Sequence, residues 1–245
     1  MMKSQKGLNS IFLMSKTLIS LTKMNNTKLH VLYEDNHLIA VNKKSGDITQ
    51  GDKTGDIPLS EIVKDFLKKK YDKPGNVYLG TIHRIDRPTT GVIIYAKTSK
   101  ALSRMNEKFR NNEISKKYWA IVKNKLPKQS DILENYLSKN NKKNKSFVTK
   151  GKDGKYSKLN YKIIKSLDNY HLYEIKPDTG RHHQIRVQLS NIGSPIKGDL
   201  KYGAKRSNKD ASICLHAREI VFKHPVTKEE LKITAPTPEN TIWNS

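Results

Sequence analysis

The strand-rich stretch between residues 131 and 177 constrains the fold of this chain most strongly. Its short apolar runs alternate with polar segments, and consecutive strands joined in this way pair antiparallel. The part from 139 to 158 carries eight lysines and one aspartate, with Gly151 and Gly154 among them. We predict a protruding basic hairpin there, which either grips backbone phosphates or is simply a solvated loop.

The remaining elements alternate irregularly between strands and helices. Apolar residues at helical spacing predict a helix over 58–71, and Thr98 is a typical N-cap for a second helix over 98–112. A third helix is expected to follow the turn at 178–180 and to end at Gly193. Further strands are predicted within 29–47, 92–97, 116–124, 215–225 and 230–236. This mixed order predicts an α+β fold with a large, mostly antiparallel central sheet and flanking helices, rather than a doubly wound parallel sheet.

The charge of the chain points to a polyanionic partner. Lysine and arginine number 47 against 23 acidic residues, a formal net charge of +24, and such an excess is most often found in proteins that bind nucleic acid. A genome that uses lysine freely is the alternative explanation. Arginine binds phosphates and carboxylates in a fixed forked geometry, so its placement is more informative than that of lysine. Only eight of the 47 are arginines, and four of these fall in two short motifs: Arg84, Arg87, Arg181 and Arg186.

Several broad classes of protein are disfavoured. No apolar stretch approaches the roughly 20 residues of a membrane span, so no membrane is expected as a partner. The single Cys214 cannot form an internal disulfide and lies among apolar residues, which suits a core thiol in a cytoplasmic protein. Residues 1–28 contain lysine but no acid and are expected to be a disordered or dispensable basic tail. Residues 29–245 are then one folded domain, which we expect to act as a monomer.

Metal, nucleotide and hydrolase sites are not indicated. The adjacent His182 and His183 cannot place both rings on one helical face, and no H-E-x-x-H spacing occurs, so no metal site is expected. The glycines of 51–56 form neither a phosphate-binding loop nor a dinucleotide fingerprint. A nucleophile elbow for a Ser-His-Asp triad is also missing.

The stretch IHRIDRPTTGVIIYAK, residues 82–97, sets a lone carboxylate between two arginines. Asp86 precedes a turn from Pro88 to Gly91 and then a buried strand, an arrangement that can aim one side chain into a cleft. A nearby cation stabilises an ionised carboxylate, and an ionised carboxylate can react at a sugar carbon. On these residues alone, a salt bridge at a surface turn remains the simpler alternative.

Four ordered motifs between residues 30 and 238 resemble those of the RluA-type pseudouridine synthases. HRIDRPTTGVIIYAKT is similar to the family's H-R-L-D-x-x-T-S-G-x-x-x-x-A-K signature, and KKYWAIV (116–122) to its K-x-Y-x-A-x-V strand. TGRHHQIRVQLSNIGSPIKGDLKYG (179–203) resembles T-G-R-x-H-Q-I-R…G-x-P-I-x-G-D-x-x-Y-G. The segment 215–238 resembles the ending L-H-A…F-x-H-P…A-P-x-P. Four motifs in the family's order make the resemblance specific.

The resemblance implies a pseudouridine synthase fold with two subdomains around a catalytic cleft. It also implies an enzyme that isomerises uridine in rRNA or tRNA to pseudouridine, a reaction without net redox change that requires no cofactor. Within this resemblance Asp86 is the essential carboxylate, and Arg186 pairs with it. Tyr118 lies against the uracil and could remove its C5 proton.

Three further residues are expected to contact RNA. The resemblance implies that Arg84 fills the place of the flipped base and that Leu215 forms an apolar wall under it. Arg181, together with the N-terminus of the following helix, suits a phosphate. Arg87 varies in the family pattern and is expected to touch only solvent or phosphate. The loop 194–199 is expected to support the site structurally.

Some features set this chain apart from the family pattern. The S4-like RNA-binding domain of many relatives is not expected here.

A catalytically silent RNA-binding or ribosome-assembly protein on the same fold stays an alternative. An aspartate-nucleophile phosphotransferase also stays possible, although its D-x-D pattern is missing. Four residues replace the family's usual Ser, Pro, Thr and His without removing an expected catalytic group, and they indicate a subgroup with its own substrate: Thr90, Lys44, His182 and Gln188.

Overall fold

The computed structural model describes residues 29–51, 55–151, 153–239 and 241–244. The tail expected over 1–28 lies outside the described residues, as does position 152 of the basic segment. The helices are α2 (Leu59–Lys70), α3 (Ser99–Arg110), α4 (Gln184–Asn191), the short 3-10 helix η1 (Leu200–Tyr202) and α5 (Thr241–Asn244). The strands are β1 (Val31–Glu34), β2 (Leu38–Lys43), β3 (Gly80–Thr81), β4 (Thr90–Ala96), β5 (Ser115–Val122), β6 (Ser130–Asn140), β7 (Lys145–Val148), β8 (Lys155–Ser166), β9 (His171–Pro177), β10 (Leu215–Lys223) and β11 (Glu230–Thr234).

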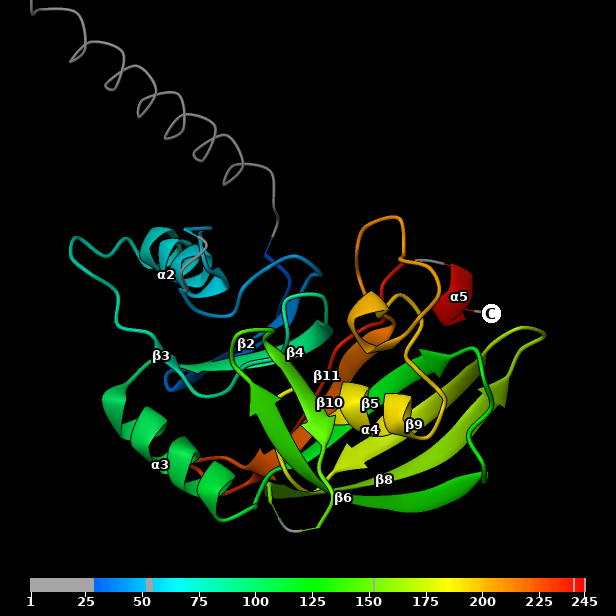
Figure 1. Cartoon of the computed structure of the whole chain (residues 1–245). Coiled ribbons are helices and arrows are strands. Elements are labelled where there is room, and N and C mark those ends of the chain that lie inside the picture. The colour runs from blue at the N-terminus through cyan, green and yellow to red at the C-terminus, as the bar shows by residue number, and fades with distance from the viewer. Residues whose placement is uncertain (1–28, 52–54, 152, 240, 245) are drawn as a thin grey trace, which may run out of the picture.

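These strands form a single eleven-stranded sheet (Figure 1). Its main path runs β1-β2-β4-β10-β5-β9-β8-β6-β7, with β3 beside β4 and β11 beside β10. β4 and β10 run parallel, and the other neighbouring pairs of the described sheet are antiparallel. The predicted α+β fold with a mixed, mostly antiparallel sheet is confirmed.

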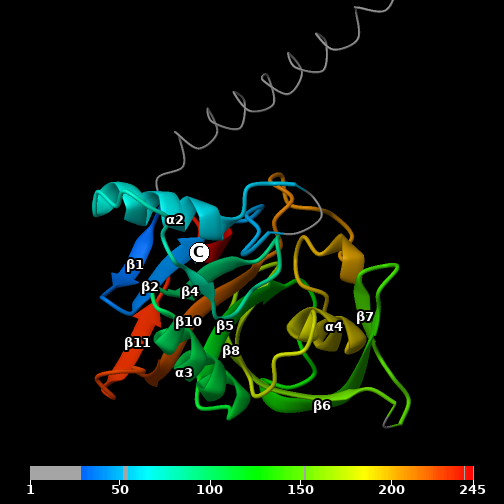
Figure 2. The same cartoon turned by 90° about the vertical axis from the view of Figure 1, so that its left-hand side faces the viewer.

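The two halves of the sheet bury their apolar residues in different ways. In β2, Ile39 and Val41 pack with α2, whereas Leu38 and Ala40 pack with α3, because neighbouring residues of a strand point to opposite faces. The other half, which consists of β5, β9, β8, β6 and β7, instead curls around α4 (Figure 2). All residues from 184 to 189 of that helix are buried, so α4 is enclosed on every side.

Local signals explain the start of α3 and the end of α4. Thr98 caps α3 as predicted, because its side chain accepts a hydrogen bond from the N–H of Ala101 over 3.1 Å. Gly193 follows α4 with a φ of +79°, also as predicted. α4 begins at Gln184, later than the sequence predicts, because residues 181–183 form a turn in which His183 has a φ of +53°. No helix in the described part of the chain is long and apolar enough to cross a membrane.

The two halves of the sheet meet where β4, β10 and β5 lie side by side. Gly91 approaches β10 so closely that an added Cβ would stand 2.2 Å from the carbonyl oxygen of Ala217, and its φ is +115°. Only glycine fits such a position. The loop before β4, the start of β10 and the middle of β5 are therefore brought together.

Candidate active site

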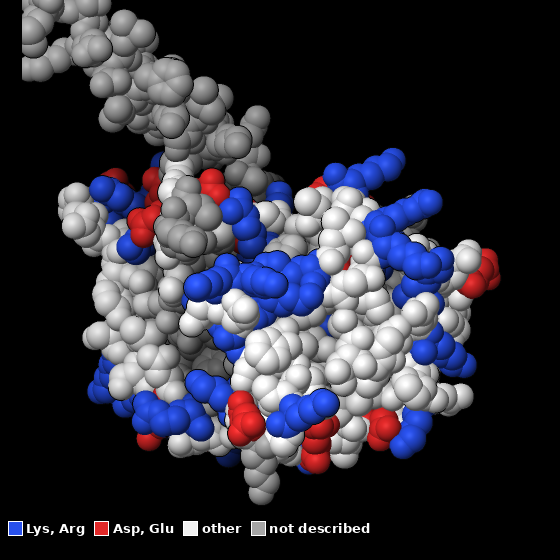
Figure 3. Space-filling model, viewed as in Figure 1, with Lys and Arg blue, Asp and Glu red and all other residues white. Residues whose placement is uncertain are grey.

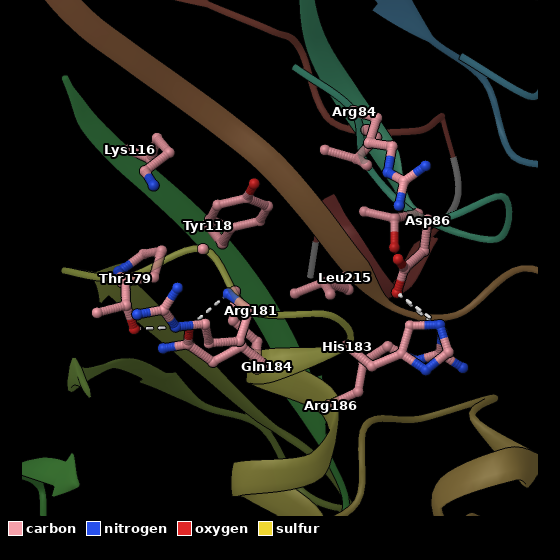
Figure 4. Close-up of a pocket in the computed structure, with 15 residues that line it drawn as sticks. Arg84, Asp86, Lys116, Tyr118, Thr179, Arg181, His183, Gln184, Arg186 and Leu215 are labelled. Carbon is pink, nitrogen blue, oxygen red and sulfur yellow. Dashed lines mark hydrogen bonds and ion pairs between the residues drawn. The ribbon is translucent and has the colours of Figure 1, made fainter. Parts of the chain in front are cut away.

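A pocket of about 120 Å³ opens where the loop before β4, strands β5 and β10, and helix α4 meet (Figure 4). These elements come from distant parts of the chain and from both halves of the sheet. The pocket lining includes all six site residues that the sequence predicts: Arg84, Asp86, Tyr118, Arg181, Arg186 and Leu215.

The predicted ion pair between Asp86 and Arg186 is present in this pocket. Nη1 of Arg186 donates a hydrogen bond to Oδ2 of Asp86 over 2.8 Å. The Arg186 side chain is 5% exposed and that of Asp86 is 28% exposed, so the carboxylate is accessible while the cation is buried. Burial alone would lower the pKa of Arg186, but hydrogen bonds and charges of two carboxylates outweigh it and raise that pKa. Arg186 is therefore a permanent cation beside Asp86.

The second carboxylate belongs to Asp199, which the sequence analysis did not assign to the site. It lies in the loop after α4, is 1% exposed, and accepts hydrogen bonds from Nε and Nη2 of Arg186 over 2.7 and 2.8 Å. The ring of Tyr202 lies 5.0 Å from the same guanidinium. The expected supporting role of the 194–199 loop is thus confirmed, and the G-D pair in its motif was the signal that could have identified Asp199.

A buried lysine holds the loop that carries Asp86. Lys43, at the end of β2, is 1% exposed, and burial lowers its pKa to about 8. Its Nζ donates hydrogen bonds to the carbonyl oxygens of Lys44, Arg87 and Thr89 over 2.9, 3.0 and 2.8 Å. The N–H of Thr89 also donates to the carbonyl of Asp86 over 3.0 Å. The loop is therefore fixed to β2 through contacts that the sequence pattern did not indicate.

Tyr118 and Leu215 supply apolar surface to the pocket. Leu215 is 4% exposed at the start of β10, and Tyr118 lies on the neighbouring strand β5. Burial and then the charge of Asp86 raise the pKa of Tyr118, so its hydroxyl is protonated at neutral pH. A protonated phenol can accept a proton only when it passes its own proton to a neighbour. This condition applies to any role of Tyr118 as a base.

The other three arginines of the two motifs differ in their contacts. Arg84 is exposed, and within the described chain it makes no ion pair with Asp86. Nε of Arg181 donates a hydrogen bond to a backbone carbonyl of β8 over 2.9 Å. Arg87 forms an ion pair with Asp56 over 2.7 Å. The expectation that Arg87 touches only solvent or phosphate is therefore wrong.

The adjacent His182 and His183 lie at the edge of the site, with ring centroids 3.8 Å apart. The sequence predicts a helix at these positions, which would separate the two rings, and this prediction is wrong because residues 181–183 form a turn. Burial lowers the pKa of His183 to about 3, so its ring is neutral at a distance of 3.7 Å from Asp86. Over residues 29–51, 55–151, 153–239 and 241–244, no three His, Cys, Asp or Glu side chains are grouped to hold a metal ion.

Basic side chains surround the pocket. An adjoining groove of about 560 Å³ shares Arg84, Asp86 and Arg186 with it, and Lys139 of β6 and Lys201 of η1 line the groove as well. Among the described residues that line this groove, Asp86 is the only acid. Lysine and arginine side chains gather in a band across the middle of the face in Figure 3. The basic hairpin of segment 139–158 thus contributes at least Lys139 to the surroundings of the site.

Comparison with known proteins identifies a family. The family model described as RNA pseudouridylate synthase matches residues 37–191. The ribosomal large subunit pseudouridine synthase C of Buchnera aphidicola subsp. Baizongia pistaciae is 37% identical over 217 residues, which cover 84% of this chain and 66% of that protein. An RNA pseudouridine synthase of Bacillus subtilis, named as uncharacterised, is 30% identical over 86% of this chain and 70% of its own length. This chain spans about two thirds of the length of the curated relatives that it matches.

Solved structures share the fold. Human RNA Pseudouridylate Synthase Domain Containing 4 superposes with a TM-score of 0.72 at 22% identity, covering 93% of this chain and 94% of that one. Human RNA Pseudouridylate Synthase Domain Containing 1 gives a TM-score of 0.68 at 23% identity, covering 86% and 84%. The family match extends over more than half of the chain and includes the first two of the four motifs that contribute residues to the pocket, together with the start of the third. This chain therefore belongs to the RNA pseudouridylate synthase family, as its resemblance to the RluA-type enzymes predicts.

Proposed function

We propose that this protein isomerises uridine in structured RNA to pseudouridine, with Asp86 as the essential carboxylate. The observation that carries the proposal is the ion pair of Asp86 with Arg186 in a pocket that Tyr118 and Leu215 also line. Residues 29–245 act as the catalytic domain, and residues 1–28 are dispensable for the reaction. The protein works as a monomer in the cytoplasm, without a membrane partner.

The proposed reaction replaces one bond of the nucleoside by another. The bond between C1′ and N1 of uracil breaks, the base turns, and C1′ bonds to C5. C5 then loses its proton and N1 gains one, so atoms and charge balance without oxidant, reductant or water, and no cofactor is required. Asp86, held as an anion by Arg186, either attacks C1′ or removes the C2′ proton.

We assign Tyr118 and Leu215 to contact with the uracil. They offer apolar surfaces between which the detached uracil can turn without leaving the pocket. The hydroxyl of Tyr118 accepts the C5 proton while it gives up its own, because its raised pKa keeps it protonated beforehand. The charge of Asp86 contributes to this raised pKa after burial, so the phenol and the carboxylate interact within the pocket.

An RNA partner suits the surface around the pocket. A uridine inside folded RNA has to leave its stack to reach Asp86, and exposed Arg84 is suited to occupy the vacated place. Arg181 and the lysines along the groove are suited to phosphates, which give salt-dependent affinity that is independent of sequence. The related Buchnera protein is named for the large ribosomal subunit, so we propose large-subunit rRNA as the first substrate to test and tRNA as the second.

The competing possibility is a catalytically silent RNA-binding or ribosome-assembly protein. A pseudouridine map of rRNA and tRNA from cells with and without the gene separates the two. We expect at least one uridine to remain unmodified in the deletion strain. The wild-type gene restores the modification and the Asp86→Asn gene does not. An unchanged map would favour the silent protein.

A further inference from the structure

Arg186 contacts two carboxylates, of which one faces the pocket and one does not. Asp86 receives a single hydrogen bond from Nη1, over 2.8 Å. Asp199 receives two, from Nε over 2.7 Å and from Nη2 over 2.8 Å. Because the Asp199 side chain is 1% exposed, it cannot touch an RNA substrate. Asp199 can affect the reaction only through Arg186.

The loop that carries Asp199 is fixed to β5, the strand of Tyr118. Ile196 forms an isolated bridge with that strand, and the N–H of Lys197 donates to one of its carbonyls over 2.9 Å. Gly198 has a φ of +88°, and an added Cβ would stand 2.6 Å from a backbone oxygen. Only glycine fits this passage of the chain. The loop that carries the Asp199 carboxylate is therefore held firmly in place.

The fixed carboxylate of Asp199 leaves the guanidinium of Arg186 with one orientation. A guanidinium is planar, and its N–H groups point in fixed directions. Nε and Nη2 point at Asp199, the ring of Tyr202 lies 5.0 Å from the guanidinium carbon, and Nη1 remains for Asp86. Without Asp199, the guanidinium could rotate and direct two parallel N–H groups at Asp86. It would then bind both carboxylate oxygens and draw them away from the substrate.

We propose that Asp199 is a positioning residue, which holds Arg186 so that Asp86 receives one hydrogen bond and stays aimed into the pocket. The inference rests on the proposed function, because it concerns the same reaction. A misplacement of a reacting group by about 1 Å can slow a reaction roughly 100-fold. Binding of RNA should not change, because Asp199 lies away from the surface.

The test compares full-length wild-type and Asp199→Asn proteins under single-turnover conditions, on ribosomal RNA from cells that lack the gene. Asparagine keeps the size of aspartate but removes its charge and replaces one acceptor oxygen by a donor. We expect pseudouridine formation to be slower by roughly 100-fold, with an unchanged Kd for the RNA. Asp210→Asn is the matched control, because Asp210 accepts hydrogen bonds from Ser212 and is not among the residues that contact Arg186. It should keep the wild-type rate.

A folded Asp199→Asn enzyme with the wild-type rate would overturn the inference. So would a loss of rate matched by an equal loss of RNA affinity, which general structural damage predicts. If Asp199→Asn does not fold, Asp199→Glu decides, because glutamate keeps the charge but its longer side chain displaces the carboxylate that accepts from Nε and Nη2 of Arg186. A full rate for that variant would overturn the inference, and a slow rate with unchanged Kd would support it. An inactive wild-type protein in the same assay would instead refute the proposed function, so the two failures stay distinguishable.

Discussion

Nη1 of Arg186 and Oδ2 of Asp86 are joined by a hydrogen bond of 2.8 Å, although the two residues lie 100 positions apart in the chain. The bond connects α4, inside the curled half of the sheet, with the loop that leads into β4 in the other half. The carboxylate site therefore exists only once both halves have folded together. The fold itself selects the partner of Asp86, and the arginines on either side of it in sequence do not take that place.

The hydroxyl of Tyr118 can be separated from its ring by the substitution Tyr118→Phe. The ring surface stays, so the Kd for RNA should not change, whereas loss of the proton-transfer group should slow pseudouridine formation by about 10² to 10⁴-fold. Tyr136→Phe is the control, because that ring packs edge-on against Tyr156 and does not line the pocket. A Tyr118→Phe enzyme with full rate would show that only the ring is needed.

Arg84 is expected to act on the structure of the RNA rather than on the chemical step. Arg84→Ala should slow conversion of a uridine inside a stem far more than conversion in a short single strand of the same sequence. The reason is that unstacking the uridine costs free energy only in the stem. Arg110→Ala, at an exposed arginine at the end of α3, is the control. Equal slowing on both RNAs would place Arg84 in the chemistry instead.

Substitution of the groove lysines tests whether the basic hairpin grips backbone phosphates or is simply solvated. If Lys139 and Lys201 contact phosphates, changing each to Gln should flatten the plot of log affinity against log salt by roughly 0.7 to 0.9. The measurement uses the Asp86→Asn background, which prevents turnover during binding. Lys68→Gln, at an exposed position of α2, should leave the slope unchanged. An unchanged slope for Lys139→Gln would show that this part of the hairpin is merely solvated.

Glu34 makes part of the stability depend on pH. Burial would raise the pKa of Glu34, but hydrogen bonds from Lys70, Lys97 and Tyr71 outweigh it and hold that pKa at about 2. The folded-state pKa is therefore below the ordinary value of 4.5. Its stabilising effect is complete above about pH 4.5 and is lost as the pH falls towards 2.

The corresponding variant is Glu34→Gln. At pH 7 it should reduce the free energy of unfolding by roughly 1 to 3 kcal/mol, because the largely buried side chain at position 34 loses the charge that pairs with Lys70 and Lys97 and exchanges one acceptor oxygen for a donor. The difference from wild type should shrink as the pH drops below 4.5 towards 2, as followed by chemical denaturation. Glu61→Gln removes an exposed pair with Lys64 and should change stability by less than about 1 kcal/mol. A pH-independent difference for Glu34→Gln would contradict the assignment.

Most of the fold could be predicted because its signals are local. The alternation in β2, the cap at Thr98 and the glycine after α4 each depend on a few neighbouring residues. The start of α4 could not be predicted in this way. His183 adopts a left-handed backbone there, and its ring is held by the hydroxyl of Tyr202 over 2.9 Å, a contact that no local pattern reveals.

The site could be predicted only in part. Asp86 and Arg186 were found through motifs that resemble a known family, and the residues around them did not by themselves exclude a surface salt bridge. Asp199 and Lys43 were missed as site residues because their importance depends on partners that only the folded chain brings near. A lysine at a strand end is ordinarily exposed, and nothing in the sequence beside Lys43 shows that three carbonyl oxygens meet at its Nζ.

The most direct test of the account is conversion of RNA by the purified protein. Large-subunit rRNA from cells that lack the gene is incubated with wild-type or Asp86→Asn protein, and pseudouridine is mapped at each position. We predict that the wild type converts one or a few specific uridines, while Asp86→Asn binds the same RNA with similar affinity and converts none. Conversion by Asp86→Asn at the wild-type rate would contradict the account, and so would failure of the wild type on both rRNA and tRNA.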